Sequence, residues 1–192
     1  MTQNKNTVEA LVKSASPTVQ QKVSSIVAVF SNIKWKKVKF TIPLIPEPSH
    51  RPRLCGYRVY VPGAAKNQSF FDRNVRPMLH GLFIDTPCKI ESDIFCKTPI
   101  SFTKTQAILA EMGVLRPWVN SGDVDNYDKA IYDMMQPNEK RGHVGIMEND
   151  CLIIESQSRK FYSRNPRYEI TITYMESMPD SIRNVMRLNK LK

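Results

Sequence analysis

The 192-residue sequence is short of the residues that build metal centres from soft ligands. It has four cysteines, and no two of them form a CxxC pair: Cys55, Cys88, Cys96 and Cys151. Its three histidines do not cluster with them. The sequence therefore predicts no zinc site, and free thiols in a reducing cytosol are the default for such a chain.

Long apolar runs are also missing. No run approaches the length of about 20 residues that a membrane helix needs. The first residues, MTQNKNTVEALVKSASP, contain no apolar core of a secretion signal. We therefore expect a cytoplasmic protein with no membrane partner. A composition of 41% hydrophobic and 24% charged residues is typical of a folded chain, and the length suits one domain with extensions.

Acidic residues are fewer than basic ones, and they are unevenly placed. The chain has 28 Lys and Arg against 18 Asp and Glu, which gives a net charge of +10. Residues 1–40, 41–100 and 151–192 are all net positive, whereas residues 101–150 are net negative. The positive excess suggests a polyanionic partner. A basic protein without such a partner is the alternative that charge alone leaves open.

Hydrophobic periodicity predicts an α+β fold. Apolar residues recur at helical spacing over 18–31, at Val19, Val23, Ile26, Val27 and Phe30. Alternating residues predict strands at 57–62, 88–97, 151–161 and 167–175, with YSRNP joining the last two as a β-hairpin. The pattern divides the chain into a helical N-terminal extension (1–38), one domain (39–176) and a basic C-terminal tail (177–192).

The stretch SGDVDNYDKAIYDMM, residues 121–135, holds four of the eight acidic residues of the acidic segment. Asp123 and Asp125 are two apart, so in an extended segment both carboxylates lie on one face. Such hard oxygen ligands suit Mg²⁺ or Mn²⁺. Lys129 follows Asp125 by one helical turn, and Asp150 precedes a strand, where a third ligand could converge. Three carboxylates and a lysine in a basic protein favour metal-assisted phosphodiester hydrolysis.

The spacing alone leaves other interpretations open. An acidic pair often caps a helix or lies on a solvated loop, and Asp125 or Asn126 is a suitable N-cap for a helix that ends at Pro137. Asp128 and Asp133 are expected on the solvated surface of that helix. A calcium-binding EF-hand loop does not fit, because its glycine and glutamate are missing in this register.

The ordered motifs of the chain resemble RusA-type Holliday junction resolvases. The segments that carry the resemblance are IPLIPEPSHRPR, YRVYVPGAAKNQSFFDRNV, PCKIESDIFCKTPISFTK, GDVDNYDKAIYDMM, GIMENDCLIIESQSRKFY and RYEITITYM. They cover residues 39–175 in order. Two positions depart from the family pattern: Gly122 stands where many members have proline or arginine, and Asn149 stands where some have a further aspartate.

The resemblance implies a homodimeric endonuclease that depends on Mg²⁺, with Mn²⁺ as a substitute, and that has a mixed sheet flanked by helices. Such enzymes cut branched DNA, chiefly four-way junctions, by paired nicks during recombination, repair or phage DNA processing. A phage-encoded enzyme would act in the host cell cytoplasm. The rival functions are a less selective branch or flap nuclease and a non-catalytic, junction-binding architectural protein.

The resemblance also implies roles for single residues. Asp123, Asp125 and Asp150 match the metal-binding acids, and Lys129 matches the catalytic lysine. The predicted DNA-binding residues are Asn126 of the motif and four basic residues, Arg51, Arg53, Arg159 and Lys160. Surface solubility is the alternative role for these basic residues.

Aromatic residues and the N-terminal apolar stripe leave two further questions open. Trp35, Trp118 and Phe161 could stack on unpaired bases, or they could belong to the core. The apolar stripe of residues 18–31 must be buried, either on its own subunit or in a dimer interface.

Overall fold

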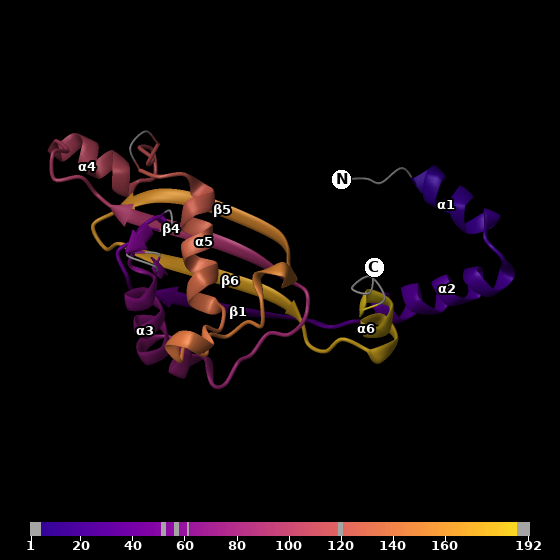
Figure 1. The fold of residues 1–192 in the computed structure, drawn as a ribbon. Helices are drawn as coiled ribbons and strands as arrows, with labels where there is room; N and C mark the ends of the chain where they lie inside the picture. The colour runs from indigo at the N-terminus through magenta and orange to yellow at the C-terminus, as the bar shows by residue number, and fades with distance from the viewer. Residues whose placement is uncertain (1–4, 51–52, 56–57, 61, 119–120, 188–192) are drawn as a thin grey trace. The chain divides into compact units, whose positions relative to one another are not determined.

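The structure is a computed structural model, and it describes residues 5–50, 53–55, 58–60, 62–118 and 121–187. The chain forms two compact units: a helical unit (residues 1–35 and 175–192) and a sheet unit (residues 36–174). Figure 1 shows the elements of each. Among the described residues, no helix is long and apolar enough to cross a membrane. The predicted boundaries at residues 38 and 176 stay predictions.

The helical unit is built from α1 (Lys5–Ser14), α2 (Pro17–Ser31) and α6 (Asp180–Arg187). Ser16 caps α2, because its hydroxyl accepts a hydrogen bond from the Val19 amide, and Pro17 takes the first turn, where a missing amide costs nothing. α6 contacts α2. The predicted helix over 18–31 is confirmed by α2, whereas α1 was not predicted.

The sheet unit is organised around a four-stranded mixed sheet. Its order is β1 (Trp35–Ile42), β6 (Arg167–Met175), β4 (Cys88–Lys97) and β5 (Ile153–Ser163). β4 is antiparallel to β6 and parallel to β5. A separate antiparallel pair is formed by β2 (Arg53–Cys55) and β3 (Arg58–Tyr60). The expected mixed α+β architecture is confirmed.

The predicted hairpin between 151–161 and 167–175 is wrong. β5 and β6 do not pair with each other, because β4 lies between them and pairs with both. β4 buries every second residue, Cys88, Ile90, Ser92, Ile94 and Cys96. Burying that row under the covering helices favours a central place for β4. The short connection 164–166 therefore passes across the end of β4 instead of closing a hairpin.

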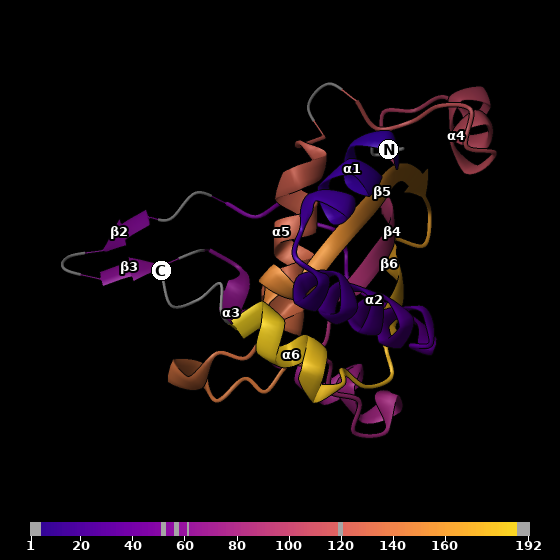
Figure 2. The ribbon, with the colours of Figure 1, turned by 90° about the vertical axis from the view of Figure 1, so that its right-hand side faces the viewer.

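Two helices cover one face of the sheet, α3 (Ala64–Asn74) and α5 (Val124–Met135) (Figures 1 and 2). α5 buries an apolar stripe of Tyr127, Ala130, Ile131, Met134 and Met135. This stripe joins the buried residues of the strands and of α3 in one core. α4 (Lys104–Glu111) lies at the end of the sheet where α5 begins (Figure 1). Short 3-10 turns follow α3 (Arg76–Leu79), follow α5 (Glu139–Arg141) and precede β5 (Asp150–Leu152).

Candidate functional site

The acidic pair lies at the start of α5. Asp123 takes the N-cap position with an extended backbone, but its side chain makes no capping hydrogen bond. Asp125 lies in the first turn, and both residues are exposed. The helix begins at Val124, so the predicted N-cap at Asp125 or Asn126 is wrong. The Asp123 carboxylate is therefore not used for capping and stands at the surface.

Gly122 allows the chain to turn immediately before the pair. Its φ is +76°, a region that favours glycine, and a Cβ built on it would lie 2.9 Å from Cγ of Pro48. A proline or arginine, which many relatives were expected to have here, would not fit this turn. The departure from the family pattern thus has a local steric cause.

Lys160 of β5 holds the loop that carries Asp123. Its Nζ donates to Oγ of Ser121 at 2.9 Å and to the carbonyl oxygen of Gly122 at 2.7 Å. The hydroxyl of Tyr127 donates to the carbonyl oxygen of Ser121. Burial raises the pKa of Tyr127, with a smaller contribution from Cys96, so the phenol keeps the proton that it donates. The acidic loop is therefore anchored from both β5 and α5.

The segment ahead of β2 is fixed to the same helix turn. The amide of Ser49 donates to the carbonyl oxygen of Asn126 at 2.8 Å. This contact brings the chain that leads into the predicted DNA-binding arginines next to the acidic pair. Arg51 itself lies outside the described residues, as does the side chain of Arg53, so their contacts with DNA stay predictions.

A polar row on α5 faces β5. Ser158 donates to Oδ1 of Asp128 at 2.5 Å, and the Tyr132 hydroxyl lies 2.7 Å from Oγ of Ser156. Burial raises the pKa of Asp128; the Ser158 bond opposes this shift, and the charge of Asp125 adds to it. Asp128 is half-buried, so its expected place on a solvated helix surface is wrong.

Asp133 lies further along α5 and is also half-buried rather than solvated. Burial raises its pKa, the positive charge of Lys129 lowers it, and the negative charge of Asp150 raises it. Lys129 is exposed and has Asp125 and Asp133 one turn away on either side. Its role in catalysis, rather than in surface pairing, stays a prediction.

The chain ahead of Asp150 makes a tight backbone-to-backbone contact with the end of α5. The amides of Ile146 and Met147 both donate to the carbonyl oxygen of Met135, at 2.7 and 3.0 Å. Gly145 makes this possible, because its φ is +65° and a Cβ on it would lie 2.3 Å from that same oxygen. The chain then starts its 3-10 turn at the exposed Asp150.

The acids are distributed along α5 instead of surrounding one point. Asp150 is an electrostatic neighbour of Tyr132 and Asp133. Asp133 lies eight residues beyond Asp125, or about 12 Å along a helix axis. Within the described parts of the chain, no three Asp, Glu, His or Cys side chains are grouped so that they could hold a metal ion. The structure thus places Asp123 and Asp125 at one end of α5 and Asp150 beside Asp133.

Two other predicted side chains already have partners on the opposite face of the sheet. Arg159 forms a two-pronged ion pair with Asp93, at 2.7 and 2.9 Å. Phe161 stacks on Phe95, with ring centroids 5.1 Å apart, and the Arg116 guanidinium covers it at 4.0 Å. Contact of Arg159 with DNA stays a prediction, and it would compete with this pair.

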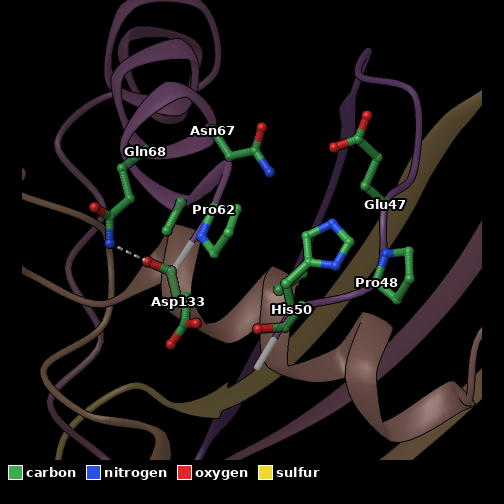
Figure 3. Close-up of a pocket in the computed structure, with 10 residues that line it drawn as sticks. Glu47, Pro48, His50, Pro62, Asn67, Gln68 and Asp133 are labelled. Atoms are coloured by element: carbon green, nitrogen blue, oxygen red, sulfur yellow. Dashed lines mark hydrogen bonds between the residues drawn. The ribbon is translucent and has the colours of Figure 1, made fainter. Parts of the chain in front are cut away.

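A small pocket adjoins the site and was not predicted from the sequence. It lies between the segment 47–50, α3 and α5 and is lined in part by Glu47, His50, Asn67, Gln68 and Asp133 (Figure 3). Nε2 of the buried Gln68 donates to the backbone oxygen of Asp133 at 2.8 Å. Gln68 gives no signal in the sequence, because only the packing of α3 against α5 assigns it this role.

Comparisons with known proteins identify the family of the chain. The family model described as "Endodeoxyribonuclease RusA" matches residues 43–173. A curated relative from Bacillus subtilis (strain 168), "Uncharacterized protein YqaN", is 30% identical over 146 residues, which is 70% of this chain and 94% of the relative. The family match over residues 43–173 includes the acidic pair, Lys129, Asp150 and Lys160.

Proposed function

Because this chain belongs to the RusA endodeoxyribonuclease family, we propose that it is a Mg²⁺-dependent endonuclease that resolves four-way DNA junctions and other branched DNA by paired nicks. It would act as a homodimer, so that two sites meet opposite strands of one junction. The observation that carries the proposal is the exposed acidic pair, which lies on an anchored loop in a chain of net charge +10.

The residues at the start of α5 fit a magnesium ion. Mg²⁺ is commonly held by one or two carboxylates together with substrate phosphate, and it keeps several waters. Asp123 and Asp125 are exposed, and Asp123 is not engaged in capping. These two carboxylates would hold the ion, which supplies Lewis-acid activation of water when bound. Mn²⁺ prefers similar oxygen ligands and is the expected substitute.

Side chains of the protein would neutralise charge on the phosphate and position the acidic loop. Lys129 is exposed one turn after Asp125, where its ammonium could neutralise charge on a scissile phosphate. Lys160 and Tyr127 keep the acidic loop in place before the substrate arrives. We also propose Asp150 as a third essential acid, and this part of the proposal is supported by its match to the family motif alone.

A labelled four-way junction, a flap and a linear duplex of the same sequence test the proposal, each with and without Mg²⁺ or Mn²⁺. We expect cleavage of the junction in either metal, no cleavage without metal, and an intact duplex. Asp125→Asn should abolish cleavage and leave junction binding intact, because the change removes a metal ligand and a negative charge near phosphate.

Other outcomes would identify a different function. Equal cleavage of flap and junction would indicate a less selective branch nuclease. Binding of the junction with no cleavage in either metal would indicate an architectural protein. Cleavage by Asp125→Asn at the wild-type rate would show that the acidic pair is not the site.

A further inference from the structure

The segment between β4 and α5 carries the most exposed large apolar side chains of the described sheet unit. Ile100, Met112, Val114 and Trp118 are 93%, 69%, 62% and 81% exposed. Single exposed apolar residues are ordinary on protein surfaces, so each of these needs further evidence before it is taken as a contact. The largest of them is the indole of Trp118.

Trp118 is exposed in its side chain but fixed in its backbone. Its carbonyl oxygen accepts a hydrogen bond from Oγ of Ser121 at 2.9 Å. The same Oγ accepts from Nζ of Lys160, which also binds the carbonyl oxygen of Gly122. The residue before it, Pro117, is buried. One hydrogen-bonded chain therefore links the backbone of Trp118 to the loop that carries Asp123.

The other aromatic candidates are less suited to meet a ligand. Phe161 has one partner ring and one guanidinium, Phe95 and Arg116, which occupy its stacking contacts. Trp35 is 38% exposed, less than half the value for Trp118. Of the three aromatic residues that the sequence singled out, Trp118 is the one whose ring is open to solvent and whose backbone is joined to the acidic loop.

The charges of the segment 98–118 favour a polyanion over a second protein surface. Lys104 and Arg116 are exposed in the same segment. The one acidic residue between Thr98 and Trp118 is Glu111, whose carboxylate accepts from the Arg164 amide at 2.5 Å and from Oγ of Ser163 at 3.4 Å. An exposed indole in a segment that also carries exposed basic side chains suits nucleic acid, because bases bind by stacking and phosphates by charge.

We propose that Trp118 stacks on an unpaired base beside the cleavage site of branched DNA, and this inference rests on the proposed function. Paired bases in a duplex are stacked on their neighbours and leave no face free. Bases at a branch or in a single strand do expose a face. Trp118 would therefore make the protein distinguish open from fully paired DNA next to the acidic loop.

Two single-tryptophan variants of the full chain test the inference directly, because the chain has only two tryptophans. Trp35→Phe leaves Trp118 as the reporter, and Trp118→Phe leaves Trp35 as the matched control. Each is titrated in EDTA, without cleavage, with a forked DNA that has unpaired thymine arms and with a blunt duplex. We expect the forked DNA to quench Trp118 emission strongly, the duplex to change it little, and Trp35 emission to respond to neither.

Binding affinity gives the second measurement. Trp118→Ala should weaken binding of the forked DNA between about 5-fold and 100-fold, the range for loss of one base–aromatic stack. Its binding of the duplex should change less than twofold, and Trp118→Phe should retain most of the affinity for the fork. Circular dichroism and a urea melt confirm that the variant is folded.

The outcomes separate this inference from the proposed function. If saturating forked DNA does not change Trp118 fluorescence while the chain still cleaves junctions, the stacking proposal is wrong and the proposed nuclease function stands. Equal quenching by fork and duplex also overturns it. A shift of Trp118→Ala from dimer to monomer in sedimentation assigns the surface to a second copy instead. Failure of the wild-type chain to bind any branched DNA removes the proposed function and the inference together.

Discussion

At the scale of single residues, the ammonium of Lys160 binds protein oxygens, whereas a DNA-binding lysine was expected to be available for phosphate. Its ammonium has two protein oxygen partners, both in the loop just before Asp123. The neighbouring Arg159 points to the other face of the sheet and pairs with Asp93. Two adjacent basic residues therefore have distinct surroundings, and the geometry favours a positioning role for Lys160.

Replacing Lys160 by methionine should slow cleavage without weakening DNA binding. Loss of the two hydrogen bonds would let the acidic loop shift, and a displacement of about 1 Å can cost roughly 10²-fold in rate. Single-turnover cleavage at saturating enzyme measures this step. Arg159→Met is the matched control, because it removes the same charge from the opposite face of the same strand.

Salt dependence distinguishes positioning from phosphate contact. A lysine that binds phosphate reduces the slope of log affinity against log salt by about one when it is removed. An unchanged slope for Lys160→Met, together with slow cleavage, supports positioning. A reduced slope with a normal cleavage rate would assign Lys160 to the DNA instead.

Lys129 raises the corresponding question for catalysis. On a helix surface, a lysine paired with Asp125 or Asp133 contributes only about 0.3–0.5 kcal/mol to stability. A lysine that stabilises transition-state charge is worth about 2.7–4 kcal/mol, or roughly 10²–10³ in rate. We expect the larger loss for Lys129→Ala in single-turnover cleavage. A loss of cleavage rate below about threefold, well under 1 kcal/mol, would show that Lys129 only pairs with its neighbours on the helix surface.

At the scale of elements, the end of α5 and the segment before β5 depend on one glycine. The amides of Ile146 and Met147 share the carbonyl oxygen of Met135, and Gly145 passes close to that oxygen. This contact holds the segment ahead of Asp150 against the end of α5. A side chain at Gly145 would therefore disturb the packing there.

Gly145→Ala should destabilise the protein by about 2–6 kcal/mol, the sum of a left-handed backbone without glycine and an overpacked contact. Gly142→Ala is the matched control. Its φ of +64° is nearly the same as that of Gly145, but a Cβ there meets nothing within 4 Å. Urea unfolding of both variants gives the difference, and equal losses would show that the contact with Met135 does not matter.

At the scale of the whole molecule, α2 carries an uncovered apolar stripe. Val19, Val23, Val27 and Phe30 are exposed, and Lys22 is the one charged residue of the helix. A stripe with so little charge is poorly suited to phosphate and better suited to an apolar partner. It is the expected place where the helical unit would add to a dimer interface.

Paired substitutions test this role. Val23→Lys with Val27→Lys should shift sedimentation from dimer towards monomer, because burying two charges in an apolar contact is costly. Gln21→Lys with Ser25→Lys adds the same charge at the same spacing on the opposite side of α2 and should leave the dimer unchanged. A dimer that both pairs leave intact would mean that the stripe packs elsewhere.

Several features follow from local sequence alone, because they depend on residues close together in the chain. The helix over 18–31, the strand over 88–97, the acidic pair with Lys129 and the resemblance to a nuclease family all follow from spacing that can be read directly. Periodicity reports which face of an element is buried, and motif spacing reports which side chains share a turn.

Only the tertiary structure decided which residues that are far apart in the sequence contact each other. It placed β4 between β5 and β6, brought Lys160 to the carbonyl oxygen of Gly122, and pressed Gly122 against Pro48. It also divided the acids, with Asp123 and Asp125 at the start of α5 and Asp150 beside Asp133. Strand order depends on which row of side chains the core can bury most completely, and a contact between distant residues leaves no period in the chain.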